Sequence, residues 1–160
     1  MELFEEAVEH DKAGRFVEAE KLYDMILTQN PTNPGLLATM GTLYLKMQRL
    51  GLAICLMEQA LKSNPTQADL LSNLSLAYKH SGLRDKCMEY AERSIKVNPT
   101  AATLANYGGL FTQTANSEKA IKYSEMAIEK DPTLKIAHWN LALACMESGQ
   151  WERGWKEHEW

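Results

Sequence analysis

The chain has 160 residues, of which 45% are hydrophobic and 24% are charged, which is the composition of a folded globular protein rather than of a disordered or fibrous chain. Its 17 basic residues are outnumbered by 21 acidic ones, and no run of Lys and Arg forms a phosphate-binding stripe. The charge therefore argues against nucleic acid and against an anionic membrane surface as partners. No apolar stretch approaches the roughly 20 residues that a membrane-spanning helix needs.

The three cysteines, Cys55, Cys87 and Cys145, are odd in number and lie far apart in the sequence. Such spacing is typical of reduced thiols rather than of a disulfide framework. The N-terminal segment carries Glu2 and Glu5 where a secretory signal would be basic. The sequence therefore predicts a cytoplasmic protein with free thiols.

A tripeptide of Asn or Asp, Pro and Thr recurs along the chain at a nearly constant period. Its prolines are Pro31, Pro65, Pro99 and Pro132, so that successive steps are 34, 34 and 33 residues. Asn and Asp tolerate the left-handed conformation that closes many helices, and proline bars a helix from continuing. The tripeptides therefore predict four points at which one helix ends and the next begins.

A second set of helix breaks lies about midway between the prolines. These breaks fall at Gly14, Gly82, Gly149, Gln48-Arg49 and Thr114-Ala115. Each repeat is therefore expected to hold two helices joined by a tight turn. No run of β-branched residues alternates at a period of two, so no strand is predicted. In chain order the predicted helices cover residues 2–13, 16–29, 34–47, 50–63, 68–81, 84–97, 101–114, 117–130, 135–148 and 151–160.

The first helix of each repeat carries the same stripe of side chains. In the second repeat this stripe is Leu37, Met40, Gly41 and Tyr44, whose spacing of three, one and three places them on one helical face. A large residue, a small one and then an aromatic suit two helices that cross closely at the small residue. The stripe recurs as Leu71, Leu74, Ser75 and Tyr78, as Leu104, Tyr107, Gly108 and Phe111, and as His138, Leu141, Ala142 and Cys145. Matching small positions on the second helices are Ala19, Ala53, Cys87, Ala120 and Gly154.

This pattern resembles the tetratricopeptide repeat (TPR), whose signature of about 34 residues combines a bulky residue, Leu-Gly, an aromatic, Ala, a second bulky residue and Pro. Four full repeats and most of a fifth cover the chain, at about residues 1–33, 34–67, 68–100, 101–134 and 135–160. The resemblance implies a single all-α array, a solenoid of about five helix-turn-helix repeats over residues 1–160 with a right-handed superhelical twist. Stacking is needed because one helix pair cannot bury its apolar face alone.

In the TPR family the first helices line a concave groove that holds a peptide or a partner protein. The resemblance therefore implies a protein-interaction scaffold with no enzymatic activity and no cofactor. The sequence contains no Gly-rich phosphate loop, nucleophile elbow or HExxH motif, and its four histidines show no metal-ligand spacing. Carried onto this chain, the groove positions include Thr39, Ser72, Asn73, Leu76, Lys79, His80, Asn106, Gln113, Trp139, Asn140 and Leu143.

Three of these groove positions hold asparagine. Asn73, Asn106 and Asn140 are 33 and 34 residues apart, so that one falls in each of three successive repeats. An Asn amide both donates and accepts, and it can match a peptide unit without reading a side chain. The spacing is similar to the asparagine ladder in the repeats of O-GlcNAc transferase, which implies a grip on an extended peptide backbone. The alternative is that these asparagines only support helix packing.

The last predicted helix carries Trp151, Trp155 and Trp160 and ends after about two turns. A closing repeat is expected to present a polar outer face, so these indoles predict a contact at the end of the array. We expect Trp155 to turn inward and Trp160 to contact either another copy or a further C-terminal domain. The first of these contacts makes self-assembly one alternative function. The segment 154–160 also resembles a tail of bacterial TPR arrays that lead into a glycosyltransferase-like domain. That resemblance implies a second alternative, the recognition arm of a larger enzyme.

Overall fold

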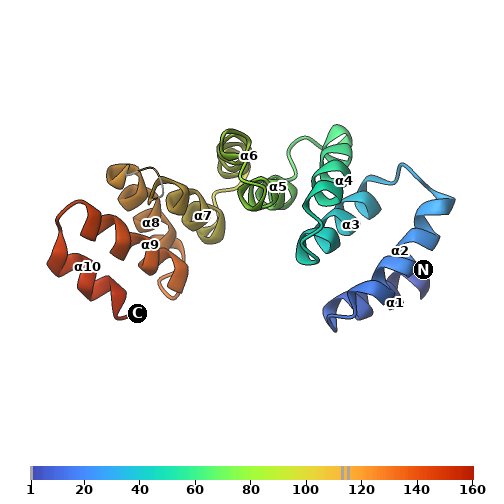
Figure 1. Ribbon diagram of the computed structural model, residues 1–160, viewed down its shortest axis with the longest axis horizontal. Coiled ribbons are helices and arrows are strands. Elements are labelled where there is room, and N and C mark those ends of the chain that lie inside the picture. The colour runs from blue at the N-terminus through green and yellow to red at the C-terminus, as the bar shows by residue number, and fades with distance from the viewer. Residues whose placement is uncertain (1, 113, 115) are drawn as a thin grey trace. The chain divides into compact units, whose positions relative to one another are not determined.

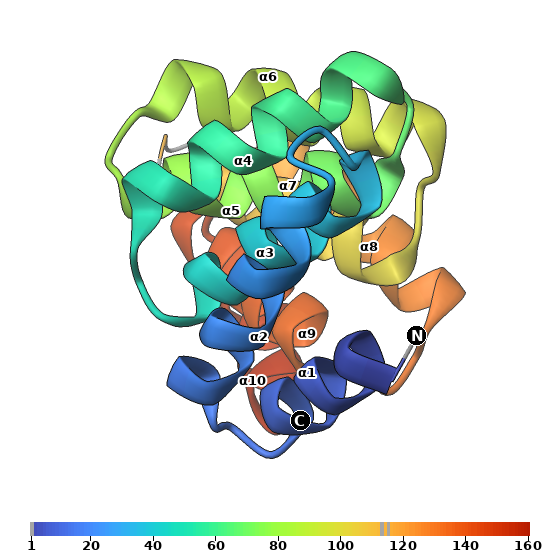
Figure 2. The ribbon, with the colours of Figure 1, turned by 90° about the vertical axis from the view of Figure 1, so that its right-hand side faces the viewer.

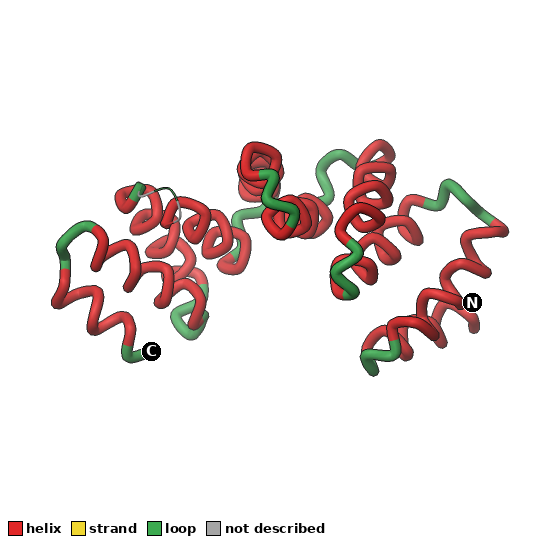
Figure 3. Tube along the Cα trace, in the orientation of Figure 1, coloured by secondary structure: helices red, strands yellow, loops and turns green. Residues whose placement is uncertain are grey.

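The computed structural model describes residues 2–112, 114 and 116–160, and every regular element in these ranges is an α-helix (Figures 1 and 3). The all-α prediction is confirmed, and each helix begins and ends within two residues of its predicted limits. The helices are α1 (Glu2–Lys12), α2 (Phe16–Gln29), α3 (Pro34–Lys46), α4 (Leu50–Ser63), α5 (Ala68–His80), α6 (Arg84–Val97), α7 (Ala101–Thr112), α8 (Ser117–Lys130), α9 (Lys135–Glu147) and α10 (Trp151–His158).

The chain forms two compact units, Met1–Cys87 and Met88–Trp160, which divide inside α6. In the first unit α1 packs on α2 and α3 packs on α4, and in the second α7 packs on α8 and α9 on α10 (Figures 1 and 2). The first helices of successive repeats also contact each other, α3 with α5 and α7 with α9. Each unit is therefore built from the helix pairs that the repeat pattern predicts, and a single array over residues 1–160 stays a prediction.

The predicted stripe is the core of each helix pair. All its members on α3, α5, α7 and α9 are buried, as are the small residues predicted on the second helices. At Gly41 an added Cβ would lie 2.5 Å from Met57 Cγ and 3.3 Å from the Ala53 carbonyl oxygen. At Ser75 the crossing admits a hydroxyl because Oγ donates to the Cys87 carbonyl oxygen at 3.0 Å. The helices of a pair thus cross at the small residue, as predicted.

The Asn-Pro-Thr and Asp-Pro-Thr tripeptides end second helices, but their first residues are not left-handed. Asn30, Asn64 and Asp131 have φ of −143°, −139° and −142°, so the expected left-handed conformation is wrong. The side chain supplies the reason. Asp131 Oδ1 accepts from the Thr133 hydroxyl at 2.7 Å and from its backbone N–H at 2.9 Å, and these two hydrogen bonds lower the pKa of Asp131. Such a side-chain turn closes the helix without a positive φ.

Positive φ occurs instead at the turns midway through the repeats. Gly14, Gly82 and Gly149 have φ of 75°, 73° and 81°, and Gln48 has φ of 59°. A left-handed conformation costs a non-glycine residue roughly 1–2 kcal/mol, and glycine adopts it freely. Glycine is therefore the expected residue at these turns, and the turn at Gln48 is the one with an unfavourable backbone conformation. At the fifth predicted break, Ala115 lies outside the described residues.

Polar contacts join each second helix to the next first helix in the first unit. Tyr44 donates its hydroxyl proton to Glu20 Oε1 at 2.9 Å, and Arg49 Nη1 lies 2.7 Å from the same oxygen. Burial, together with the hydrogen bond to Glu20, raises the pKa of Tyr44 to about 12. Tyr78 repeats the arrangement on Glu58 Oε1 at 2.5 Å. The aromatic of the stripe therefore both packs in its own pair and anchors that pair to the preceding one.

Substitution of Gly41 tests the close crossing. We expect Gly41→Ala to lower the free energy of unfolding by about 1–3 kcal/mol, because the new methyl group must displace Met57 or the backbone of α4. Urea unfolding followed by circular dichroism measures this change. Gly51→Ala on α4 is the matched control, since an added Cβ there meets nothing within 4 Å and alanine favours the helix. Equal destabilisation by both changes would contradict the proposed role of the crossing.

Candidate functional site

In the first unit the predicted groove residues lie on α3 and α5. Asn73 donates from Nδ2 to Thr42 Oγ1 at 3.2 Å, which joins the two helices, and its side chain is half-buried. Thr39 donates to the carbonyl oxygen of Gly35 within its own helix. The predicted residues with exposed side chains on this unit are Leu76, Lys79 and His80, and Ser72 is half-buried. The structure therefore brings these residues onto adjacent first helices, as the repeat positions predict.

Two further polar contacts on these helices have no counterpart in the repeat pattern. Lys46 Nζ lies 2.8 Å from both carboxylate oxygens of Asp11, which links α3 to α1. His80 Nδ1 lies 3.2 Å from Gln48 Oε1, which links α5 to the turn after α3. The spacing of the first helices predicts which residues lie opposite each other, but it does not predict which of them pair. These contacts reduce the number of polar groups that a partner could use on this unit.

In the second unit the two asparagines of the predicted ladder have different surroundings. Asn140 is 6% exposed, and its Nδ2 donates to the Ala105 carbonyl oxygen of α7 at 2.9 Å. Its amide also lies against Gly109, where an added Cβ would be 3.0 Å from Nδ2. Asn106 is exposed. Asn140 thus holds two first helices together, whereas Asn106 presents its amide to solvent.

The remaining predicted groove residues are Trp139, Leu143 and Gln113. Trp139 is 47% exposed on α9, and Leu143 is half-buried on the same helix. Gln113 lies outside the described residues. The indole of Trp139 is therefore the largest apolar group among the predicted groove residues of this unit.

A buried histidine joins α9 to the C-terminal helix, and the stripe predicts its burial but not its bonds. His138 Nδ1 lies 2.6 Å from Glu157 Oε2, and its Nε2 lies 2.9 Å from the Pro132 carbonyl oxygen. Both ring nitrogens of His138 thus contact an oxygen atom, one of a carboxylate and one of a backbone carbonyl. Trp160 stacks on this ring, with centroids 4.3 Å apart and planes inclined by 11°. The end of the chain is therefore fixed to α9 through one imidazole.

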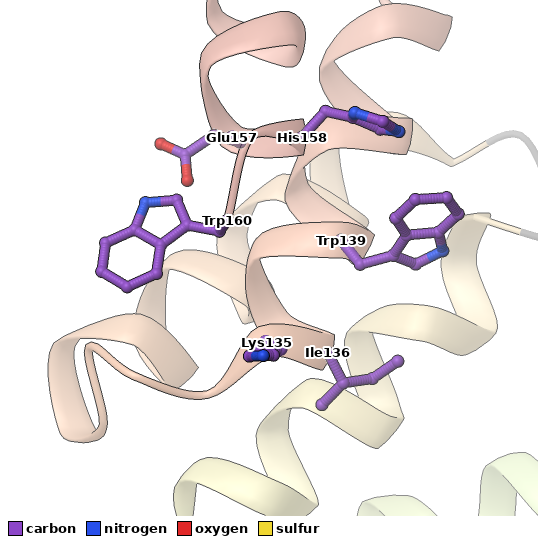
Figure 4. A pocket seen from close by; sticks show the side chains of 6 residues that line it. All are labelled: Lys135, Ile136, Trp139, Glu157, His158 and Trp160. Atoms are coloured by element: carbon purple, nitrogen blue, oxygen red, sulfur yellow. The ribbon is translucent and has the colours of Figure 1, made fainter.

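Beside this histidine lies a pocket of about 420 Å³ between the start of α9 and the end of α10 (Figure 4). Trp139 and His158 lie on one side of it, and Trp160 lies with Glu157 on the other. The rings of Trp139 and His158 are 5.2 Å apart. The pocket thus combines Trp139, predicted for the groove, with Trp160, predicted for the end face. Its residues are Lys135, Ile136, Trp139, Glu157, His158 and Trp160.

The other indoles of α10 face solvent. Trp151 and Trp155 are each 59% exposed, and Trp160 is 60% exposed despite its contact with His138. The expectation that Trp155 turns inward is therefore wrong. Gly154 takes the inward position, where an added Cβ would be 2.7 Å from Met146 Cγ, and the next residue of an α-helix points about 100° away. The side chains of Trp151 and Trp155, four residues apart, share the outer face.

The described part of the chain contains no group of three His, Cys, Asp or Glu side chains placed to hold a metal ion. Within the same residues no helix is both long and apolar enough to cross a membrane.

Paired helices crossing at small residues, with a period of 33 or 34, define a protein of the TPR class. The chain belongs to the family described as the Psidin N-terminal TPR repeats region, whose model matches residues 6–105. No curated protein matches the chain in sequence.

Solved structures with this fold include several TPR proteins. A crystal structure of MamA is 21% identical, with a TM-score of 0.85 over 96% of this chain and 90% of that one. A tetratricopeptide repeat protein from Parabacteroides merdae is also 21% identical, with a TM-score of 0.84 over 98% of this chain and 62% of the other. YrrB, described as a TPR protein with an unusual peptide-binding site, is 16% identical, with a TM-score of 0.78 over 97% and 80% of the two chains. At these identities the similarity establishes the fold.

Substitution of Glu157 tests the attachment of α10. We expect Glu157→Ala to weaken the packing of α10 by about 1.5 kcal/mol, because His138 loses a charged hydrogen-bond partner. Backbone amides of α10 should then exchange with deuterium faster, while those of α3 stay unchanged. Glu159→Ala, which removes an exposed carboxylate two residues further on, is the control. Unchanged exchange in α10 of the Glu157 variant would mean that the histidine contact does not hold the helix.

Proposed function

We propose that the chain is a protein-interaction scaffold that binds an extended peptide along the first helices of its repeats. One observation carries this proposal: the first helices bury one stripe completely and leave a chemically mixed face uncovered. In the first unit Leu76 and Lys79 of α5 are exposed, and in the second unit Asn106 of α7 and Trp139 of α9 are exposed. Apolar groups with nearby amide and charged groups are what recognition of a peptide requires. The peptide-binding site for which YrrB is described belongs to a protein of the same fold and supports the proposal.

The asparagines have separate roles in this proposal. Asn106 is the group offered to a peptide backbone, because its amide is exposed. Asn140 positions α9 against α7 through the Ala105 carbonyl oxygen and has little exposed surface left for a ligand. Asn73 is intermediate, since its amide nitrogen bonds Thr42 while its side chain is only half-buried. The proposed contact with peptide is therefore strongest at Asn106.

Two asparagine variants separate binding from packing. A peptide is first selected against the purified chain from a random display library, and its affinity is measured by fluorescence anisotropy. We expect Asn106→Ala to weaken its binding by about twofold to tenfold, as the loss of a hydrogen bond worth about 0.5–1.5 kcal/mol requires, without changing stability. Asn140→Ala should lower the free energy of unfolding by a similar amount.

The selection and the Asn106 variant each decide a different point. Failure to select any peptide would argue against the scaffold function. Unchanged affinity in the Asn106 variant would refute only the role of this residue.

We further propose that the protein is not an enzyme and that it lies in a reducing, cytoplasmic compartment. Its proposed partner is a protein rather than nucleic acid. All three cysteines are free thiols, and Cys87 and Cys145 are buried without a disulfide. The formal charge of −4 supports a partner other than nucleic acid.

Self-association is a second candidate function, favoured by the outer face of α10. Trp151 and Trp155 lie on that face and are each 59% exposed. Burying a large apolar side chain is worth about 1.5–3 kcal/mol, so burial of these two indoles would stabilise the binding of a second copy there. Paired exposed aromatics of this kind usually mark an interaction site.

Sedimentation equilibrium at rising protein concentration tests this candidate. We expect the chain to associate, and the double variant Trp151→Ser, Trp155→Ser to remain monomeric, because the shared apolar face is lost. Leu52→Ser is the control, since Leu52 is 50% exposed on α4, outside this face. A monomeric parent chain at high concentration would rule the candidate out.

A further inference from the structure

At the fifth position of the first helices, the small residue found in the second, third and fourth repeats is replaced by tryptophan in the last repeat. Phe4 holds this position in the first repeat, Ala38, Ser72 and Ala105 hold it in the next three, and Trp139 holds it in α9. Ala38 and Ala105 are 8% and 0% exposed. In the second unit the reason is visible, because Asn140 of the following first helix bonds the Ala105 carbonyl oxygen. A small residue at this position of α7 thus allows α9 to approach closely, whereas the indole of Trp139 on α9 is 47% exposed.

The exposed face of Trp139 belongs to the pocket between α9 and α10, whose walls are held in place. On one side the imidazole of His158 lies against the Trp139 indole at 5.2 Å. On the other side Trp160 is stacked on His138 at 4.3 Å. His138 is itself fixed by Glu157 and by the Pro132 carbonyl oxygen. Side chains that such contacts already order lose less conformational entropy when an apolar group binds between them.

The charges around the pocket favour an anion beside that apolar group. Glu157 lines the pocket, but its carboxylate is engaged with His138. Lys135 also lines it and, among the residues that the structure describes, has no ion pair. A cationic ligand would meet the Lys135 ammonium group, whereas a carboxylate would pair with it. The volume of about 420 Å³ lies within the range of about 300–1,000 Å³ that is typical of ligand pockets.

We propose that this pocket is an anchor site for a partner peptide, taking one aromatic or branched aliphatic side chain between Trp139 and Trp160 while an adjacent carboxylate of the peptide pairs with Lys135. This inference rests on the proposed peptide-binding function and adds the partner's chemistry to it: an apolar residue next to an acidic one. The pocket selects the residue type, and the first helices hold the backbone. The anchor also sets the position at which a peptide begins or ends on α9.

The four indole N–H signals of the chain provide the test. They are assigned in nitrogen-15 spectra by single Trp→Phe variants and followed during titration with three capped tetrapeptides. The probes are acetyl-Ala-Phe-Asp-Ala-amide, acetyl-Ala-Phe-Lys-Ala-amide and acetyl-Ala-Ala-Asp-Ala-amide. We expect the first peptide to shift the signals of Trp139 and Trp160, which line the pocket, most strongly and to leave that of Trp151 unchanged. Trp155 should shift less, because its ring only contacts His158 of the lining, at 5.9 Å between centroids. The second should bind more weakly, and the third should not bind measurably.

Two variants complete the test. Trp139→Ala should weaken binding of the Phe-Asp peptide at least about tenfold, as expected for loss of a large apolar contact. Lys135→Glu should reverse the preference, with a change of about fivefold for each peptide. Preference of the parent chain for the Phe-Lys peptide would overturn the proposal, as would shifts confined to Trp151 and Trp155 or no shift with any probe.

The outcomes also separate this proposal from the one on which it rests. A display-selected peptide that binds the parent chain but leaves the signals of Trp139 and Trp160 unchanged refutes the anchor alone. Probe binding at the pocket with Asn106→Ala having no effect on the selected peptide leaves the anchor standing without the proposed backbone contact.

Discussion

The close crossing of two helices at a small residue is the constraint on which the other features depend. Where α3 meets α4, the α-carbon of Gly41 lies so near Met57 and the Ala53 carbonyl that no further atom fits between them. This approach brings the large residues on either side of the crossing into contact, and they supply the buried area that stabilises the pair. It also determines which face of the first helix stays uncovered by its partner helix. In each unit the uncovered face, with Leu76 in the first and Asn106 and Trp139 in the second, is thus a consequence of the packing on the opposite side.

Between repeats the contacts are polar and more varied. Tyr44 reaches Glu20, Tyr78 reaches Glu58, and Asn140 reaches the backbone of α7. Hydrogen bonds at these joints have directions, so each joint fixes an orientation in a way that apolar contacts alone do not. The cost is that polar groups engaged in a joint are withdrawn from ligand binding. Asn140 and Asn106 occupy the same place in the repeat, yet one belongs to a joint and the other to the surface.

The helices and the core could be predicted because both follow from short-range periodicity. The proline period and the three-one-three stripe depend only on helical geometry, which is the same wherever the helix lies. The pocket could not be predicted, because it depends on His138 being held by Glu157 and on Trp160 stacking above it, and these residues are 19 and 22 positions apart. Hydrophobicity alone places Trp155 on the wrong side of α10, because it ignores the turn of 100° per residue that separates Trp155 from Gly154. Likewise, the asparagine period says nothing about which amide is already bonded.

Two residues buried in the cores of the helix pairs are cysteines, and their burial has a chemical consequence. Cys87 is 1% exposed at the end of the first compact unit, and Cys145 is 0% exposed in the second, where burial raises the pKa of its thiol. A thiol reacts with an alkylating agent as the thiolate and only when the reagent reaches it. The rate at which each buried cysteine is alkylated therefore reports how often its own helix pair opens. Cys55 is exposed, so its alkylation rate is that of an unprotected thiol and serves as the reference within the same chain.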